Sequence, residues 1–259
     1  MYHMRLIIKF RSMKNCKYDT RYYYYLQSFI YNILKGSKYD YIHDKKNYKF
    51  FCFSNIFPVC DYKVNDECTL IIASPNNDFI NYLYENLKNK IINNDDIQIN
   101  FMKFKIKNLK KLEVNVNTSL LITNTPVIVR IPKEKYLKYN IKPSVDYDYI
   151  YWKNEYPIDL FISQVEKNIL KKYTQYSRLN LDYVDDSSLQ SNFFHQFRFK
   201  KQVSTRIKIK GSEQIIIGTL WEFVFNPDLN KKLMSFILDV GLGERNSLGF
   251  GFVNLKKPK

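Results

Sequence analysis

The sequence predicts an α+β protein that consists of two tandem ferredoxin-like domains, each with the element order βαββαβ. Three observations lead to this fold class. Each half of the chain contains two segments whose apolar residues recur at helical spacing. Short β-branched and aromatic runs lie between these segments, as is typical of strands. The second half repeats the order of the first, so we expect domains at residues 1–115 and 116–259.

In the N-terminal half, the apolar and basic run Met4–Phe10 predicts a first strand. Tyr22–Leu34 follows with apolar residues at i, i+3, i+4, i+7 and i+8, which predicts an amphipathic helix. Gly36 is suited to end this helix at its C-terminal cap. The expected buried stripe consists of Leu26, Phe29, Ile30, Ile33 and Leu34.

The first domain continues with two more strands, Lys49–Phe53 and Thr69–Ala73. The dipeptide Ser74-Pro75 predicts a helix start, because a hydroxyl can cap the first turn and proline favours the first helical position. Asp96–Val114 predicts a final strand or hairpin. The expected buried face of the second helix consists of Phe79, Ile80, Leu83, Tyr84 and Leu87.

In the C-terminal half, Thr118–Ile131 is rich in β-forming residues and Pro157–Tyr173 has helical spacing. Two strands follow, at about Asn192–Lys210 and Glu213–Asn226, and Phe250–Leu255 closes the domain as a last strand. We expect the join between the domains to lie between Val114 and Thr118.

The two C-terminal helices have clear apolar faces. The first is expected to bury Ile158, Phe161, Ile162, Val165 and Ile169. Asn226-Pro227 is expected to open the second. This second helix is expected to bury Leu229, Leu233, Phe236, Ile237 and Val240.

The composition indicates a polyanionic partner. In 259 residues, 41 Lys and Arg stand against 25 Asp and Glu, which gives a formal net charge of +16. Aromatic residues make up 17% of the chain, and aromatic rings stack on unpaired bases. Together these features favour single-stranded nucleic acid. The alternative is a compositional excess of Lys, Tyr and Asn on a solvated surface.

The chain shows no sign of a membrane segment or a metal site. No run approaches 18 consecutive apolar residues, so we expect no transmembrane helix and no membrane partner. The four cysteines are Cys16, Cys52, Cys60 and Cys68, and their spacing differs from that of zinc sites. We therefore expect reduced thiols in a cytoplasmic protein with neither metal nor other cofactor.

The most distinctive segment is 241–251, Gly-Leu-Gly-Glu-Arg-Asn-Ser-Leu-Gly-Phe-Gly, which holds four of the seven glycines. It follows a predicted helix, whereas a dinucleotide fingerprint follows a strand, and it lacks the Lys-Ser/Thr ending of a P-loop. The segment therefore predicts a loop whose backbone N–H groups can approach an RNA backbone closely. The alternative is a tight helix-to-strand turn.

This segment resembles the C-terminal signature of the CRISPR-associated endoribonuclease number six family, in the repeat-associated mysterious protein superfamily. The stretch Tyr24–Tyr31, Tyr-Tyr-Leu-Gln-Ser-Phe-Ile-Tyr, resembles the first helix of the same family. The resemblance implies two ferredoxin-like domains and cleavage of precursor CRISPR RNA within its repeats. It further implies a metal-independent transesterification that leaves a 2′,3′-cyclic phosphate and a 5′-hydroxyl. Repeat RNA is the implied partner, with other CRISPR effector subunits as further partners, and the protein would be a monomer or a homodimer.

The resemblance also implies catalytic residues. A histidine just after the first helix is the usual general acid or base of the family, and His43 matches it. Tyr31 lies outside the buried stripe of its helix, and some family members pair such a tyrosine with the histidine. They add a lysine six residues after the histidine, which is Lys49 here. Lys45 and Lys46 are competing cations. A solvated loop histidine, a surface tyrosine and an edge-strand lysine are the alternatives.

The chain has two other histidines. His195 lies beside a basic strand region and is the second choice for catalysis, with a packed or RNA-facing role as the more ordinary interpretation. His3 is expected to have no role.

The RNA-binding surface is expected on the second domain. In Arg206-Ile-Lys-Ile-Lys210 the basic residues alternate with isoleucines, the period of a strand with one buried face. Such a row can position phosphates without reading sequence. The full set of RNA-binding candidates is Arg198, Lys200, Arg206, Lys208, Lys210, Gly243, Arg245, Ser247, Gly249 and Gly251.

Two further functions stay open. A non-cutting relative that keeps CRISPR RNA as a subunit of an effector complex would share the loop and the basic strand, so only a proton-transfer group such as His43 separates it from the enzyme. A host protein that modifies RNA or binds tRNA is the third function.

The active site is expected in the cleft between the two domains, closer to the first domain.

Overall fold

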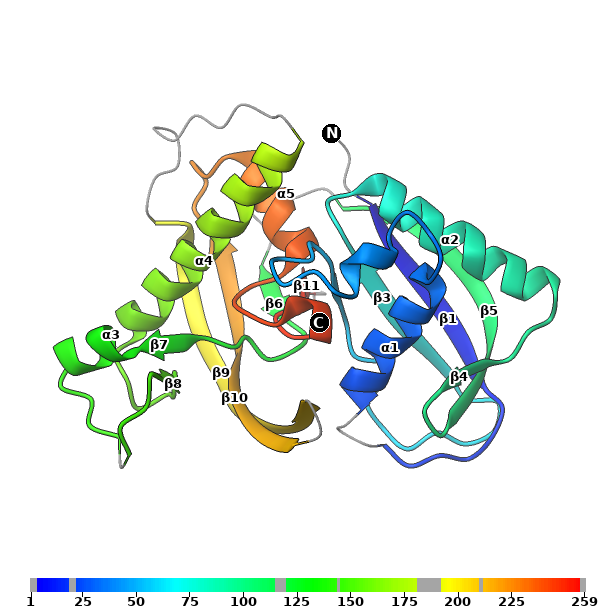
Figure 1. The fold of residues 1–259 in the computed structure, drawn as a ribbon, viewed down its shortest axis with the longest axis horizontal. Helices are drawn as coiled ribbons and strands as arrows, with labels where there is room; N and C mark the ends of the chain where they lie inside the picture. The colour runs from blue at the N-terminus through cyan, green and yellow to red at the C-terminus, as the bar shows by residue number, and fades with distance from the viewer. Residues whose placement is uncertain are drawn as a thin grey trace.

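The computed structural model describes residues 4–18, 22–114, 120–143, 145–180, 192–209 and 212–256. Two α+β units lie side by side, each with helices packed on one face of an antiparallel sheet (Figure 1). The predicted fold class is confirmed. The predicted join between the domains falls on residues 115–119, which lie outside the described residues.

The N-terminal sheet has the strand order β2-β3-β1-β5-β4, and every neighbouring pair is antiparallel. Its central strands β1 and β3 come from different halves of the βαββαβ order, as in other ferredoxin-like folds. The predicted final hairpin is β4 and β5. The elements are β1 (Met4–Ser12), α1 (Tyr22–Leu34), the short helix η1 (Asp40–Ile42), β2 (Cys52–Phe53), β3 (Glu67–Ala73), α2 (Asn77–Ile92), β4 (Ile97–Ile99) and β5 (Met102–Glu113).

The helices cover this sheet with the faces that the sequence predicts. All five stripe residues of α1 are buried, and four of the five in α2 are buried, while Tyr84 is half-buried. The predicted start of α2 is wrong by two residues. Asn76 caps the helix, and its side chain accepts a hydrogen bond from Phe79 N at 3.0 Å. The Ser74 hydroxyl instead donates to Phe50 O at 2.8 Å, which ties the helix entry to the segment that precedes β2.

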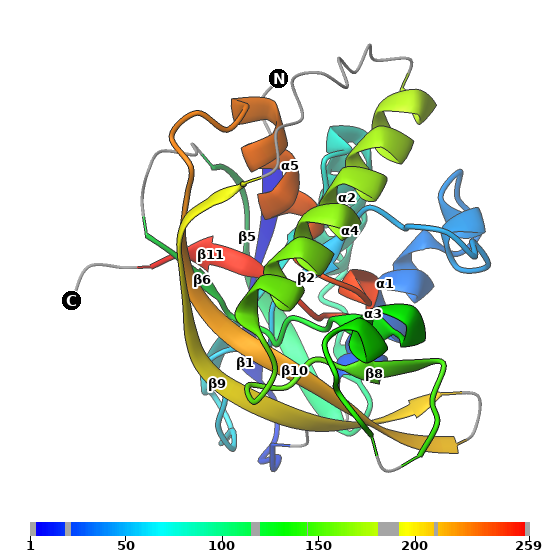
Figure 2. The ribbon, with the colours of Figure 1, turned by 90° about the vertical axis from the view of Figure 1, so that its left-hand side faces the viewer.

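The C-terminal sheet has the order β11-β6-β10-β9, again antiparallel throughout. Figure 2 shows α4 lying across the long β9–β10 ribbon. An insertion between β6 and α4 adds a two-stranded ribbon and a short helix, which the sequence did not predict in detail. The elements are β6 (Leu121–Thr123), β7 (Arg130–Pro132), α3 (Lys133–Lys138), β8 (Tyr149–Tyr151), α4 (Ile158–Leu179), β9 (Phe194–Ile209), β10 (Ser212–Phe225), α5 (Lys231–Val240), the short helix η3 (Asn246–Leu248) and β11 (Val253–Leu255).

Several predictions for these helices are wrong. Ile162 and Leu229 are half-buried and not buried, and Leu229 precedes α5. Ile158 begins α4 but is 41% exposed, and the neighbouring Leu160 is buried in its place. Helix α5 does not open at Asn226, because that side chain accepts from Asp228 N and forms a separate turn. Asn230 caps the helix by accepting from Lys232 N at 2.8 Å.

A buried arginine joins the two domains. Arg5 lies on the face of β1 that points away from the N-terminal helices, and it is 2% exposed. Its Nη2 donates to Leu238 O at 2.8 Å and to Val253 O at 3.0 Å, and its guanidinium lies 5.0 Å from the Phe252 ring centroid. Burial lowers the pKa of Arg5, while the nearby Asp239 carboxylate acts in the opposite direction. The guanidinium of Arg5 therefore binds the first domain to the second, and backbone carbonyls of the second domain solvate this charge.

We expect Arg5→Met to lower the free energy of unfolding by about 3 kcal/mol or more, because the two carbonyls lose a charged donor while buried. Lys9→Met is the matched control, since Lys9 is exposed on the same strand and should change stability by less than about 0.5 kcal/mol. Chemical denaturation measures both. Equal effects of the two substitutions would contradict the role of Arg5.

Candidate functional site

The glycine-rich loop, residues 241–251, is shaped by contacts within the protein. All four of its glycines have a positive φ, between 66° and 87°. A Cβ on Gly251 would lie 1.9 Å from Leu242 O, and one on Gly249 would lie 2.5 Å from the Phe53 ring. Each glycine is thus required by a close approach of protein atoms. Contact of Gly243, Gly249 and Gly251 with RNA stays a prediction.

The loop packs on α1 of the other domain. The rings of Tyr23 and Phe250 stack with centroids 5.2 Å apart, and Gln27 Nε2 donates to Ser247 O at 2.7 Å. Because α1 also carries Tyr31, these contacts fix the glycine-rich loop against the helix of a candidate catalytic residue.

A buried lysine on α4 holds the loop from the inside. Lys172 Nζ donates to Gly241 O at 3.2 Å, to Gly243 O at 2.7 Å and to Asn246 Oδ1 at 2.6 Å. The Asn246 amide in turn donates to Leu242 O at 2.9 Å. Burial lowers the pKa of Lys172 to about 7. Lys172 could not be singled out in the sequence, since nothing local distinguishes it from Lys171.

The three predicted catalytic residues converge. Lys49 Nζ donates to Tyr31 Oη and to His43 O, both at 2.8 Å. The rings of Tyr31 and His43 meet edge to face with centroids 5.1 Å apart. Lys49 therefore links the helix that carries Tyr31 to the short helix that ends at His43, and the three functional groups lie on one small surface. Whether they catalyse a reaction stays a prediction.

The surroundings of the cluster set its protonation. Burial raises the pKa of Tyr31 to about 12, and a hydrogen bond with the Ser247 side chain acts weakly in the opposite direction. The phenol therefore keeps its proton at neutral pH. Burial lowers the pKa of Lys49, with the Asp44 carboxylate opposing it. His43 Nδ1 lies 2.7 Å from Asp44 Oδ1, which fits the tautomer that donates from Nδ1 and leaves Nε2 as the acceptor.

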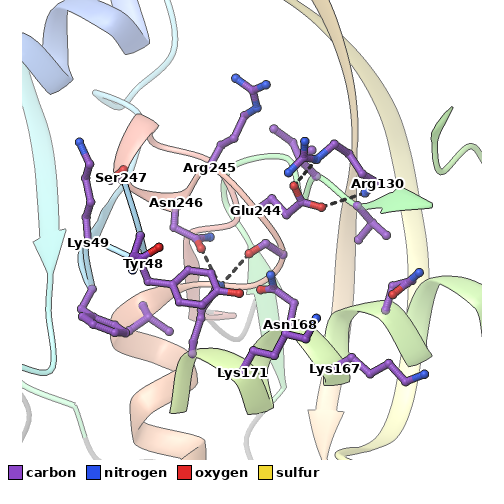
Figure 3. A pocket seen from close by; sticks show the side chains of 18 of the residues that line it. Tyr48, Lys49, Arg130, Lys167, Asn168, Lys171, Glu244, Arg245, Asn246 and Ser247 are labelled. Atoms are coloured by element: carbon purple, nitrogen blue, oxygen red, sulfur yellow. Dashed lines mark hydrogen bonds and ion pairs between the residues drawn. The ribbon is translucent and has the colours of Figure 1, made fainter. Parts of the chain in front are cut away.

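A cleft of about 840 Å³ opens between the domains beside this cluster (Figure 3). One wall is the segment 45–51, and the other walls are α4, the insertion and the glycine loop. Glu244 is ion-paired with Arg130 on one wall. The cleft is strongly basic, since the only acids among its described lining residues are Glu134 and Glu244. Its basic residues are Lys45, Lys46, Lys49, Arg130, Lys135, Lys167, Lys171, Lys172 and Arg245.

Most of this charge was not recognised in the sequence. Lys167 and Lys171 lie one helical turn apart on α4, and Lys135 lies on α3. A pair at this spacing is common on solvated helices, so only the packed structure distinguishes it. Arg245 and Ser247, by contrast, were predicted and do line the cleft.

The basic residues of β9 lie elsewhere. Arg206 is exposed and its neighbour Ile207 is buried, as the alternation predicts. Arg198 pairs with Glu222 and Arg206 with Ile215, but β9 has an extra residue between the two pairs. Because opposite partners share a face, this bulge places Arg198 and Arg206 on opposite faces of the ribbon.

None of the described basic residues of β9 is among those that line the cleft. Lys200 is ion-paired with Glu222 at 3.3 Å. The side chain of Lys208 and all of Lys210 lie outside the described residues, as does His3. His195 is exposed at the start of β9, away from the cleft lining. RNA contact by this strand stays a prediction.

Among the described residues, no group of three or more His, Cys, Asp and Glu side chains is arranged to hold a metal ion. No helix in the described part of the chain combines the length and apolarity needed to cross a bilayer.

Two ferredoxin-like domains that enclose a basic cleft, with a Tyr–His–Lys cluster at its edge, define a protein of the RNA-binding class. Residues 115–255 match the family described as CRISPR associated protein Cas6, C-terminal. The chain belongs to the Cas6 family of CRISPR-associated proteins.

Named relatives support this membership. The CRISPR-associated endoribonuclease Cas6 2 of Methanocaldococcus jannaschii is 31% identical, over 97% of this chain and 99% of the relative. The CRISPR-associated endoribonuclease Cas6 of Haloferax mediterranei is 27% identical, over 97% and 93%. A solved structure named CRISPR associated protein Cas6 shares the fold, with a TM-score of 0.69 and 20% identity, over 98% of this chain and all of that one.

We expect Gly249→Ala to cost about 1–3 kcal/mol more than Gly36→Ala in free energy of unfolding. Both positions have a positive φ, but a Cβ at Gly36 meets nothing within 4 Å, whereas one at Gly249 overlaps Phe53 and Tyr23. Chemical denaturation of both variants measures the difference, and equal losses would show that the loop does not pack on α1 as described.

Lys172 should make stability depend on pH. Its folded-state pKa of about 7 lies below the ordinary lysine value of 10.5, so between these values the unfolded chain binds more protons and stability rises with pH. We expect the stability of the wild type minus that of Lys172→Met to rise by about 1 kcal/mol per pH unit from pH 7 to 9. Denaturation at several pH values measures this, and a flat difference would mean that the three acceptors keep Lys172 protonated.

Proposed function

We propose that this protein is a metal-independent endoribonuclease that cuts precursor CRISPR RNA within its repeats. The observation that carries the proposal is the convergence of Tyr31, His43 and Lys49 at the edge of a basic cleft. The relatives that match nearly the whole chain are named CRISPR-associated endoribonucleases, which supports the same activity here.

The reaction needs no water and no metal. A ribose 2′-hydroxyl attacks the adjacent phosphorus, its proton leaves, and the bond from phosphorus to the 5′-oxygen breaks. The departing 5′-oxygen takes up a proton, so the products are a 2′,3′-cyclic phosphate and a 5′-hydroxyl. The protein must accept one proton, supply one proton and stabilise the charged phosphorane.

The cluster offers a group for each task. His43 Nε2 accepts the proton of the 2′-hydroxyl, with Asp44 at Nδ1 stabilising the imidazolium that forms. Tyr31, which burial keeps protonated, donates to the 5′-oxygen. Lys49 uses two N–H donors on Tyr31 and His43, and in the described residues its third has no partner, so it can bond to a phosphoryl oxygen.

The cleft supplies the binding site for the strand. Its lysines can neutralise phosphates on either side of the cut. Arg245 and Ser247 of the glycine loop line the cleft, and the Ser247 side chain also hydrogen-bonds to Tyr31. Since the N-terminal domain contributes the reacting groups and the C-terminal domain most of the cations, both domains are needed for a complete site.

We expect His43→Ala to reduce cleavage of repeat RNA in EDTA by about 10²–10⁴-fold, because a general base of this kind contributes that much. Tyr31→Phe and Lys49→Met should each reduce the single-turnover rate while affinity for RNA changes little. His195→Ala is the matched control and should cut as the wild type does. The measurement is the single-turnover rate with end analysis of the products.

Each alternative has its own outcome in this experiment. Tight binding of repeat RNA without any cut by the wild type would make the protein a binding subunit and overturn the enzyme. Cleavage that EDTA abolishes would overturn the metal-independent mechanism. Equal binding of repeat and unrelated RNA would favour a host RNA-binding protein.

A further inference from the structure

Two amide side chains on the cleft wall each have one buried polar atom without a partner among the described residues. Gln164 and Asn168 lie one turn apart on α4, and both line the cleft. Gln164 Nε2 and Asn168 Oδ1 are buried, and neither has a hydrogen-bond partner among the described residues. Figure 3 shows Asn168 pointing from α4 into the cleft. One donor and one acceptor without a partner among the described residues are therefore carried one helical turn apart on the wall of the cleft.

Such a pair is costly for folding alone. A buried amide that makes no hydrogen bond loses its hydration and gains nothing in return. Methionine or leucine would fill the same volume without that loss. Buried polar groups in native proteins nearly always have partners, so an orphaned pair on a cleft wall calls for a partner that the folded chain does not supply.

The surroundings indicate the chemistry of that partner. Lys167 and Lys171 lie beside the two amides on α4. Lys135 lies close enough to these two lysines that they lower its pKa, in addition to the larger effect of burial. Three ammonium groups at one place favour an anion such as phosphate. On the facing wall, Tyr48 projects into the cleft and offers an aromatic ring (Figure 3).

We propose that Gln164 and Asn168 read the edge of one unpaired nucleobase of the bound RNA. The Gln164 amide donates to a ring nitrogen and Asn168 Oδ1 accepts from an exocyclic amino group, while the base stacks on Tyr48 and its phosphate lies among Lys135, Lys167 and Lys171. Adenine and cytosine both present a ring-nitrogen acceptor beside an amino donor, and adenine is the base expected because its larger ring system stacks better on Tyr48. This inference rests on the proposed function, since it assigns sequence preference to the same cleft.

The test uses the full-length protein and a pool of single-stranded RNA with randomised sequence around a fixed repeat. RNA that the protein retains, cut or uncut, is sequenced. The wild type should prefer adenine about 10-fold at one position. Gln164→Met and Asn168→Leu keep the side-chain volume but remove the amide, and each should abolish the preference at that position and leave other positions unchanged.

Stability and a charge variant serve as controls. Both amide variants should unfold at the same denaturant concentration as the wild type or at a higher one, because each removes an unpartnered buried group. Lys167→Met should weaken the retention of all RNAs alike and keep the base preference, as expected for a phosphate contact.

The outcomes separate the two proposals. A wild type that retains and cuts repeat RNA without preferring adenine at any position overturns this inference and leaves the nuclease standing. The same holds if the amide variants keep the preference, or if they are less stable, since the amides would then have structural partners. A wild type that retains no RNA overturns the proposed function and this inference with it.

Discussion

The packing of the glycine-rich loop against α1 is the contact on which the rest of the site depends. The loop belongs to the C-terminal domain, yet it lies against Tyr23 and Phe53 of the N-terminal domain at distances that only a glycine at 249 permits. Lys172 holds its carbonyls from within, and Arg5 joins the domains on the other side of the interface. These contacts hold the two domains together beside the cleft, and a side chain at any of the loop glycines would overlap protein atoms.

In the proposed reaction, this arrangement divides the work between the domains. The N-terminal domain positions Tyr31, His43 and Lys49 through one helix, one short turn and the segment that follows it. The C-terminal domain contributes Lys167 and Lys171 from α4. Neutralising a phosphate chain requires many cations spread along a path, whereas proton transfer requires a few groups at one point. A cleft at the domain junction satisfies both requirements, since each domain can be specialised for one of them.

Much of the fold could be predicted because its helices are amphipathic. The stripe of α1 follows directly from apolar spacing, and so does most of α2. The errors occur where local hydrogen bonds compete. Ser74 could have capped α2, but its hydroxyl bonds to Phe50, which is distant in sequence, and Asn76 takes the cap. The bulge in β9 could not be predicted either, because an extra residue in a strand leaves no mark on the alternation of Arg206 and Ile207.

The sequence by itself determined the fold class and the glycine segment, since spacing and a specific motif are local properties of the chain. The three residues of the candidate catalytic cluster followed from the family resemblance that this motif carries. Only the tertiary structure decided that the glycines serve packing and that Lys172 is buried while Lys171 is exposed. It also decided that one amide atom each of Gln164 and Asn168 lacks a partner among the described residues. Burial and hydrogen bonding depend on which distant segments meet. Lys171 and Lys172 cannot be told apart in the sequence. They differ in burial and hydrogen bonding only after the chain has folded.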